Sequence, residues 1–376
     1  MSYTVLARRY RSQSFDQVVG QAPIARTLQN AIDANRVAHA YLFCGTRGVG
    51  KTTSARLFAK ALNGGSPDVD AAIMTGKDVD VIEIDAASNT GVDNVRELIA
   101  NSAYRPLRGK YKIYIIDEVH MLSPNAFNAL LKIMEEPPEH VKFILCTTDP
   151  QKVPATIQSR CQRYDFRNIS TAQIAEHLGN VVKQESLTAD PELLFTIAKI
   201  AAGSMRDGLS LLDRVLASGQ KHLTLKLLEE LLGLPDREVT SKMIDAIAEG
   251  DAGEVLTQAQ ALLDRGTSTD QALDSLLARL RDLMVLAAAG PKTPLVELTD
   301  DNRATEAARA EKFDAAGLSH MIVLCENVQR AAKNSAVPRI LFEAVLVRLA
   351  LTEKIADATA LVTGRGMSGV PEPKKR

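Results

Sequence analysis

The stretch YLFCGTRGVGKT, residues 41–52, decides the fold of this chain. It places the pattern GxxxxGK[ST] directly after a short apolar segment that reads as a strand and directly before a segment with helical periodicity. The apolar positions of that helix share one face: Ala55, Phe58, Ala59 and Leu62. Glycines let the backbone turn tightly, so that its N–H groups and the helix N-terminus point at phosphate oxygens. The stretch therefore predicts a phosphate-binding loop, and disfavours a glycine-rich turn with a solvated lysine.

The side chains of this loop have distinct expected roles. We expect Lys51 to reach the terminal phosphates of a nucleoside triphosphate and Thr52 to offer its hydroxyl to Mg²⁺. The residues expected to contact the nucleotide are Gly45, Thr46, Arg47, Gly48, Val49, Gly50, Lys51, Thr52 and Thr53.

Two adjacent acids follow another apolar strand, IYII at residues 113–116. They should face the loop, because the carboxyl ends of parallel strands meet the ligand crevice. We expect Asp117 to orient Mg²⁺ together with Thr52, and Glu118 to polarise an attacking water. A lone acidic pair would more often cap a turn or a helix, but the upstream loop favours the functional interpretation. For His120, a structural hydrogen bond and a role in the site stay equally open.

The rest of the chain is organised around this loop. Residues 1–168 alternate short apolar segments with amphipathic ones, which is typical of a parallel sheet covered on both faces by helices. Strands are expected at residues 41–44, 79–86, 112–117, 142–147 and 163–166. Residues 169–234 read as a small helical domain, 235–363 as a third, all-helical domain, and 364–376 as a disordered tail. The predicted fold class is α/β, followed by two helical domains.

The composition argues against several other classes of protein. The 376 residues are 45% hydrophobic and carry a formal net charge of −1, which neither suggests nor excludes a nucleic-acid partner, because a local basic surface can exist on a neutral chain. The apolar stretches are too short to span a bilayer. No two cysteines have the close spacing of a zinc or redox site; they are Cys44, Cys146, Cys161 and Cys325. We expect reduced thiols, a cytoplasmic location and no membrane contact.

Three further motifs narrow the class of nucleotide-binding protein. LCTTDP at residues 145–150 places hydroxyls at the end of another strand, SRC follows at 159–161, and GSMRD at 203–207 opens a helix in the second domain. Together they resemble sensor 1, the arginine finger and sensor 2 of AAA+ proteins. Longer stretches resemble the gamma/tau family of bacterial DNA polymerase III, the ATPase subunits of its clamp loader. These stretches are LARRYRSQSFDQVVGQ at 6–21, HAYLFCGTRGVGKTT at 39–53, EIDAASNTGVD at 83–93, and the segment from IIDEVHMLS to TTDPQKVPATIQSRC at 115–161.

The resemblance implies roles for residues whose chemistry alone would not reveal them. Thr148 matches sensor 1 near the terminal phosphate, Arg206 matches a lid residue that contacts phosphate, and Arg160 matches a finger that reaches a neighbouring subunit's ATP. Arg160 could instead pair with a surface carboxylate, and Ser204 with Asp207 could simply cap a helix. The residues that match the adenine frame are Ala7, Tyr10 and Arg11, together with Val18, Val19 and Gly20. Tyr10 and Val19 could equally be core residues.

The resemblance also implies an activity. The chain would be an ATPase that uses ATP and Mg²⁺ to load a sliding clamp onto primed DNA within the DNA-directed DNA polymerase III complex. Its three domains would be an AAA+ ATPase domain, a helical lid and a helical collar that joins subunits. Expected partners are copies of itself, other clamp-loader subunits, the sliding clamp and primer-template DNA, contacted through its phosphates.

Two other interpretations stay open, namely another AAA+ DNA remodeller or helicase, and a nucleotide-binding scaffold without hydrolysis. A basic cluster is a candidate DNA contact, although a solvated loop explains it better; its members are Arg105, Arg108, Lys110 and Lys112.

One segment departs from the family pattern. The resemblance implies a zinc module of four cysteines directly after the phosphate-loop helix, but residues 63–70, NGGSPDVD, contain no cysteine. Aspartates without thiolates make a poor tetrahedral zinc site, so we predict that no zinc is bound. The Gly-Gly-Ser run suggests a flexible connector in place of the module.

Overall fold

The computed structural model describes residues 4–88, 91–333 and 335–351. The chain forms two compact units, residues 1–223 and 224–376, which are described separately below. The domain boundaries expected at 168/169 and 234/235 stay predictions. The expected tail, residues 364–376, and the last residues of the expected third domain lie outside the described residues.

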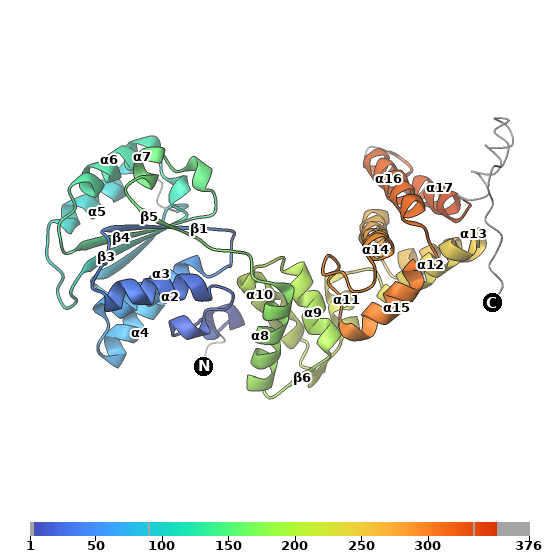
Figure 1. Ribbon diagram of the computed structural model, residues 1–376, viewed down its shortest axis with the longest axis horizontal. Coiled ribbons are helices and arrows are strands. Elements are labelled where there is room, and N and C mark those ends of the chain that lie inside the picture. Colours follow the sequence, from blue (N-terminus) through green and yellow to red (C-terminus); the bar gives the residue numbers. More distant parts are fainter. Residues whose placement is uncertain (1–3, 89–90, 334, 352–376) are drawn as a thin grey trace. The chain divides into compact units, whose positions relative to one another are not determined.

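The first unit is built on a five-stranded parallel sheet in the order β2-β3-β4-β1-β5 (Figure 1). Its strands are β1 Ala40–Cys44, β2 Val81–Asp85, β3 Lys112–Asp117, β4 Val141–Thr147 and β5 Gln162–Asp165. All five expected strands are present. Every residue of β1 and β4 is buried, as is typical of central parallel strands whose two faces are both covered by helices.

Helices pack on both faces of the sheet, and alternate residues of each strand point to opposite faces (Figure 1). Leu42 and Phe143 face one layer of helices, whereas Tyr41 and Ile144 face the other. The first layer consists of α5 Val92–Ser102, α6 Pro124–Glu135 and α7 Ala155–Gln158. The second consists of α2 Ala22–Asp33, α3 Lys51–Asn63 and α4 Pro67–Thr75. The predicted α/β class is confirmed.

The segment after the phosphate-loop helix is partly helical. The side chain of Ser66 caps α4 by accepting a hydrogen bond from Val69 N at 3.4 Å, and Pro67 occupies the first turn. The expected connector, residues 64–66, therefore ends where α4 begins, because the cap at Ser66 and the proline at position 67 both favour the start of a helix. Within the described residues, no group of three or more His, Cys, Asp or Glu side chains could hold a metal ion.

The first unit continues into three helices, α8 Thr171–Gln184, α9 Pro191–Ile200 and α10 Met205–Leu216. Two short strands, β6 Thr188–Ala189 and β7 His222–Leu223, pair beside them in parallel. The sequence did not predict these strands, because two residues are too few to show a period of two. Below, α8, α9 and α10 are called the lid.

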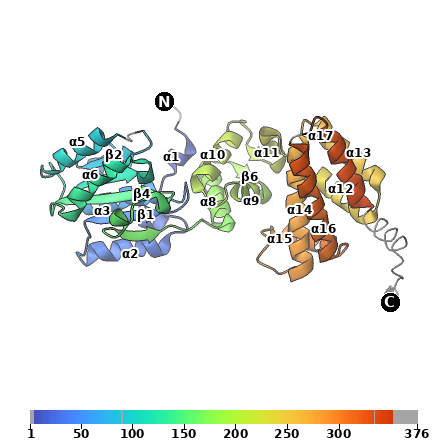
Figure 2. The ribbon, with the colours of Figure 1, turned by 90° about the horizontal axis from the view of Figure 1, so that it is seen from above.

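The second unit is entirely helical within its described residues (Figure 2). Its helices are α11 Leu225–Leu232, α12 Arg237–Glu249, α13 Ala252–Asp264, α14 Thr269–Ala289, α15 Asp300–Ala310, α16 Ala315–Ala332 and α17 Pro338–Ala350. Leu273, Leu276 and Leu280 form a fully buried face of α14 and pack in the core of this bundle. In the part of the chain that the structure describes, no helix combines the length and apolar character that a membrane span requires.

Candidate active site

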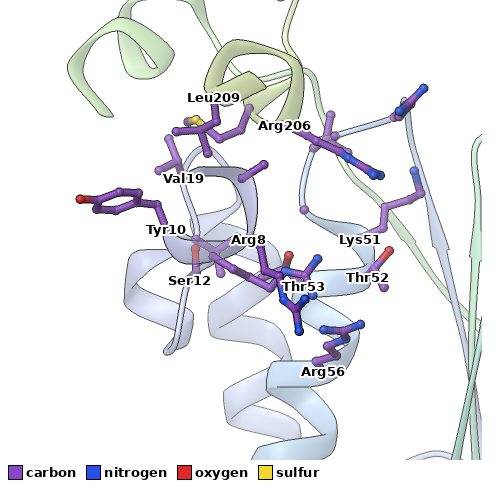
Figure 3. A pocket seen from close by; sticks show the side chains of 18 of the residues that line it. Arg8, Tyr10, Ser12, Val19, Lys51, Thr52, Thr53, Arg56, Arg206 and Leu209 are labelled. Carbon is purple, nitrogen blue, oxygen red and sulfur yellow. The ribbon is translucent and has the colours of Figure 1, made fainter. Parts of the chain in front are cut away.

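A cavity of about 420 Å³ opens in the first unit where the phosphate loop, the N-terminal segment and the start of α10 meet (Figure 3). Most residues that the sequence predicted for the site line it. They are Ala7, Tyr10, Arg11, Val18, Val19, Arg47, Gly48, Val49, Gly50, Lys51, Thr52, Thr53, Asp117, Glu118 and Arg206. Gly20, Gly45, Thr46, Thr148 and Arg160 do not line it.

Lys51 is buried at the start of α3, with 5% of its surface exposed. Its Nζ donates hydrogen bonds to the carbonyl oxygens of Gly45 at 2.8 Å and Thr46 at 2.9 Å. Burial lowers the pKa of Lys51, whereas the nearby carboxylates of Glu118 and Asp117 oppose that change. The ammonium group is thus held inside the loop by carbonyls that a phosphate can replace.

Asp117 and Thr52 lie next to each other at the end of β3. Thr52 Oγ1 donates a hydrogen bond to Asp117 Oδ2 at 2.6 Å. Burial raises the pKa of Asp117, and the hydrogen bond from Thr52 opposes this shift. A hydroxyl and a carboxylate oxygen side by side fit Mg²⁺, which takes few protein ligands and keeps waters and phosphate oxygens.

Glu118 adopts a left-handed backbone conformation with φ 47°, which is uncommon for a residue with a side chain. Its Oε2 accepts hydrogen bonds from Thr148 Oγ1 at 2.8 Å and Thr148 N at 3.3 Å. His120 Nδ1 lies 3.4 Å from the same oxygen and 3.0 Å from Thr147 Oγ1. Thr148 therefore reaches the site through Glu118, whereas Thr147 is buried behind it.

Arg206 comes to the cavity from the first turn of α10, which Ser204 caps by accepting a hydrogen bond from Asp207 N at 3.2 Å. The N–H of Met205 donates to the Gly48 carbonyl at 3.1 Å, so this helix begins directly on the phosphate loop. In Figure 3 the Arg206 side chain extends toward the same side of the cavity as Lys51. Ser204 and Asp207 thus form the helix cap, and Arg206 beside them still lines the cavity.

The N-terminal segment forms the other wall. Tyr10 lines the cavity, but its ring points away from Lys51 and Thr52 (Figure 3). Its hydroxyl donates a hydrogen bond to Glu185, the residue that follows α8. Burial lowers the pKa of Arg11, and the positive charge of Arg56 adds to that effect.

Arg160 lies outside the cavity of its own chain. Its guanidinium donates to Glu135 Oε1 at 2.7 Å and to the Thr156 carbonyl at 2.7 Å, and its side chain is 33% exposed. Within a single chain it therefore has the surface ion pair that the sequence analysis left open.

The sequence analysis missed several residues that line the cavity. They are Val5, Arg8, Ser12, Arg56, Thr75, Ile169, His177, Met205 and Leu209. Arg56 could have been predicted, because it follows Thr52 by one helical turn and therefore lies on the same face of α3. His177 could not have been predicted, because tertiary packing, and no local sequence pattern, brings α8 to the cavity.

Models of three DNA polymerase III families match the chain. The delta subunit model matches residues 20–170, the clamp loader subunit ATPase lid model matches 173–221, and the gamma and tau domain III model matches 223–364. The DNA polymerase III subunit gamma of Buchnera aphidicola is 40% identical over 286 residues, which cover 74% of this chain and 79% of that protein. The chain belongs to the gamma/tau family of DNA polymerase III subunits. The resemblance that the sequence indicated is confirmed.

Longer gamma/tau relatives extend beyond the matched region. The tau subunit of Escherichia coli is 42% identical over 311 residues, 79% of this chain and 48% of that protein. The tau subunit of Bacillus subtilis is 39% identical over 362 residues, 94% of this chain and 64% of that protein. This gamma/tau chain thus spans about half to two thirds of their length. Among solved structures, the Holliday junction branch migration motor RuvB of Thermotoga maritima matches with a TM-score of 0.47 and 17% identity, covering 64% of this chain and 80% of that one.

Proposed function

We propose that the chain is an ATPase subunit of the DNA polymerase III clamp loader, which uses ATP and Mg²⁺ to load a sliding clamp onto primed DNA. One observation carries the proposal: Lys51, Asp117, Glu118 and Arg206, which come from distant parts of the sequence, converge on one cavity beside the phosphate loop. Membership of the gamma/tau family supports the link from ATP hydrolysis to clamp loading.

The residues of the cavity suit phosphoryl transfer to water. Lys51 can exchange the carbonyls of Gly45 and Thr46 for phosphate oxygens, and the N–H groups of the loop can hold the remaining oxygens. Glu118 can accept a proton from water while Thr148 fixes the direction of its carboxylate. Thr52 and Asp117 would hold Mg²⁺, which neutralises charge on the phosphate oxygens when it is bound.

Arg160 is proposed to act in trans. It does not line the cavity of its own chain, and a guanidinium paired to an exposed carboxylate can exchange that partner for a phosphate of a neighbouring subunit. Copies of this chain and other clamp-loader subunits would supply that neighbour. We further propose primer-template DNA as a partner through its phosphates, a cytoplasmic location and no membrane contact.

The test is steady-state ATP hydrolysis by the chain assembled with clamp-loader subunits, with and without sliding clamp and primed DNA. We expect clamp and DNA to stimulate hydrolysis. In Arg160→Ala the stimulated rate should be lower by a factor of roughly 10³ or more. Arg163→Ala is the matched control, because Arg163 is a nearby exposed arginine that pairs with Asp165. A rate that neither clamp nor DNA changes would contradict clamp loading, and would favour a general remodeller or a scaffold.

A further inference from the structure

Residues 166–169 carry the chain from β5 to the lid, and one buried amide joins this segment to the phosphate loop. Gln21 is 2% exposed. Its Nε2 donates to the Arg167 carbonyl at 2.7 Å and to the Val49 carbonyl at 3.4 Å, and its Oε1 accepts from Arg167 N at 3.3 Å. Loss of these hydrogen bonds would leave a buried amide without partners, which costs free energy. Gln21 therefore holds the two segments at a fixed separation.

Asn168 joins the same segment to the loop a second time. Its Oδ1 accepts a hydrogen bond from Thr46 Oγ1 at 2.6 Å. On its other side it packs against the lid, because a Cβ built on Gly203 would lie 2.7 Å from Asn168 Cβ. The next residue, Ile169, donates its N–H to the Gly203 carbonyl at 3.2 Å. Asn168 thus lies between the phosphate loop and the turn that precedes α10.

Thr46, the loop residue that is hydrogen-bonded to Asn168, is also bonded to Lys51, and it loses that second bond in the proposed reaction. Lys51 Nζ is bonded to the Thr46 carbonyl, while the Thr46 hydroxyl is bonded to Asn168. When Lys51 turns to a phosphate, Thr46 loses the first bond and its backbone is free to move. Any such movement is passed to residues 167–168, and through Gly203 to the start of α10.

We propose that Gln21 and Asn168 are positioning residues that form a latch, transmitting the state of the phosphate loop to the lid and thereby to Arg206. The latch rests on the proposed function, since it requires that the loop bind a nucleotide. Neither side chain lines the cavity, so both act through the segments that they join.

Hydrogen–deuterium exchange of the full chain, with and without ATPγS and Mg²⁺, tests the latch. In the wild type, nucleotide should slow exchange both in the phosphate loop, residues 45–53, and at the start of α10, residues 201–208. In Gln21→Ala and Asn168→Ala we expect the protection of the loop to persist. The protection of residues 201–208 should fall roughly two- to tenfold, the change in an equilibrium that one lost hydrogen bond produces.

Two further variants sharpen the test. Asn168→Asp keeps the oxygen that accepts from Thr46 and should restore the protection of residues 201–208. Gln29→Ala removes an exposed glutamine whose amide donates a hydrogen bond to Asp33 on the same helix, and should behave like the wild type. Thermal unfolding shows whether each variant is folded. If Gln21→Ala does not fold, the test rests on Asn168→Ala, because Asn168 is exposed and its replacement leaves the core intact.

The outcomes separate the latch from the activity on which it rests. Protection of residues 201–208 that is equal in the wild type and in Asn168→Ala would overturn the latch and leave the ATPase proposal standing. Absence of any nucleotide protection at residues 45–53 in the wild type would overturn the ATPase proposal and the latch together.

Discussion

Glu118 combines a left-handed backbone with a carboxylate that Thr148 fixes by two hydrogen bonds. Replacing it by glutamine keeps the size of the side chain but removes the negative charge that accepts a proton from water. We expect Glu118→Gln to bind ATP and to hydrolyse it roughly 10² to 10⁴ times more slowly. Binding of a fluorescent ATP analogue and phosphate release measure the two effects separately. Glu136→Gln, at an exposed acid after α6, is the control, and unchanged turnover in Glu118→Gln would remove Glu118 from its proposed role.

Two buried tyrosines of the sheet make a matched pair for stability. Tyr114 and Tyr41 are both fully buried, and burial raises the pKa of each to about 12. Tyr41 Oη accepts a hydrogen bond from Ala38 N at 2.8 Å, whereas Tyr114 Oη has no hydrogen-bond partner among the described residues.

These environments predict opposite effects of removing the hydroxyl. Tyr114→Phe should raise the free energy of unfolding by about 1 kcal/mol, because an unpaired buried hydroxyl is removed. Tyr41→Phe should lower it by about 1 to 2 kcal/mol, because the Ala38 N–H loses its acceptor. Urea denaturation measures both, and a loss of stability in Tyr114→Phe would show that its hydroxyl has a partner.

At the scale of elements, the phosphate loop and α10 approach each other as closely as a glycine allows. Gly48 has φ +77°, and a Cβ built on it would lie 1.9 Å from Ser204 Oγ. Gly48→Ala therefore combines a strained backbone with a collision at the cap of α10. We expect its affinity for a fluorescent ATP analogue to fall about tenfold or more. Gly65→Ala should retain wild-type affinity, because among the described residues nothing beyond its two chain neighbours lies within 4 Å of the added Cβ.

Another element, the loop before β3, is organised by a single buried carboxylate. Asp80 is 2% exposed and accepts hydrogen bonds from the N–H groups of Leu107, Arg108 and Gly109 at 2.7, 2.7 and 2.9 Å. Burial opposes ionisation, but the three N–H groups outweigh it and lower the pKa of Asp80 below its ordinary value. The basic cluster thus includes residues of an anchored loop.

This arrangement predicts a pH-dependent effect of Asp80→Asn. A carboxyl whose folded pKa is lowered stabilises the fold above its unfolded pKa of roughly 3.9, and that contribution is lost as pH falls through the folded pKa. We expect Asp80→Asn to cost about 2 kcal/mol at pH 7 and clearly less at pH 3. Urea denaturation at both pH values checks this, with the exposed Asp33→Asn as control. A cost that does not depend on pH would contradict the ionised state of Asp80.

At the scale of the whole molecule, the second unit has a polar network of its own. Glu306 is 6% exposed and accepts hydrogen bonds from Arg279 at 2.7 Å and Arg309 at 2.8 Å. Arg309 in turn forms two hydrogen bonds with Asp245, at 3.0 and 2.9 Å. The network joins α12, α14 and α15: Glu306 links α15 to Arg279 of α14, and Arg309 links α15 to Asp245 of α12.

We expect Glu306→Gln to destabilise the second unit by about 3 kcal/mol, because the buried guanidinium of Arg279 loses the charge of its ion-pair partner, whereas Arg309 keeps Asp245. Hydrogen–deuterium exchange of α14, combined with urea denaturation followed by circular dichroism, measures this. Glu343→Gln breaks only an exposed pair with Arg339 one turn away and should cost less than about 0.5 kcal/mol. Equal stability of the two variants would show that the buried network contributes little.

The sequence by itself determined the features that depend on neighbouring residues. The glycines around Lys51, the strand that ends at Asp117 and the caps of the helices are local patterns, and backbone geometry translates each into one structure. The parallel sheet followed from the alternation of such segments. Most of the predicted cavity residues followed as well, since strand ends and the loop after β1 meet at one edge of the sheet.

Only the tertiary structure decided which distant residues meet. Gln21 bonds Arg167 across 146 positions and Thr46 bonds Asn168 across 122, and neither pair has a periodic or motif signal. The same holds for the place of His177 of α8 in the cavity lining, for the N–H groups that donate to Asp80, and for the position of Arg160 outside the cavity of its own chain. The physical reason is that a side-chain hydrogen bond needs a partner within a few ångströms in space, whereas sequence patterns record only the conformation of residues close along the chain.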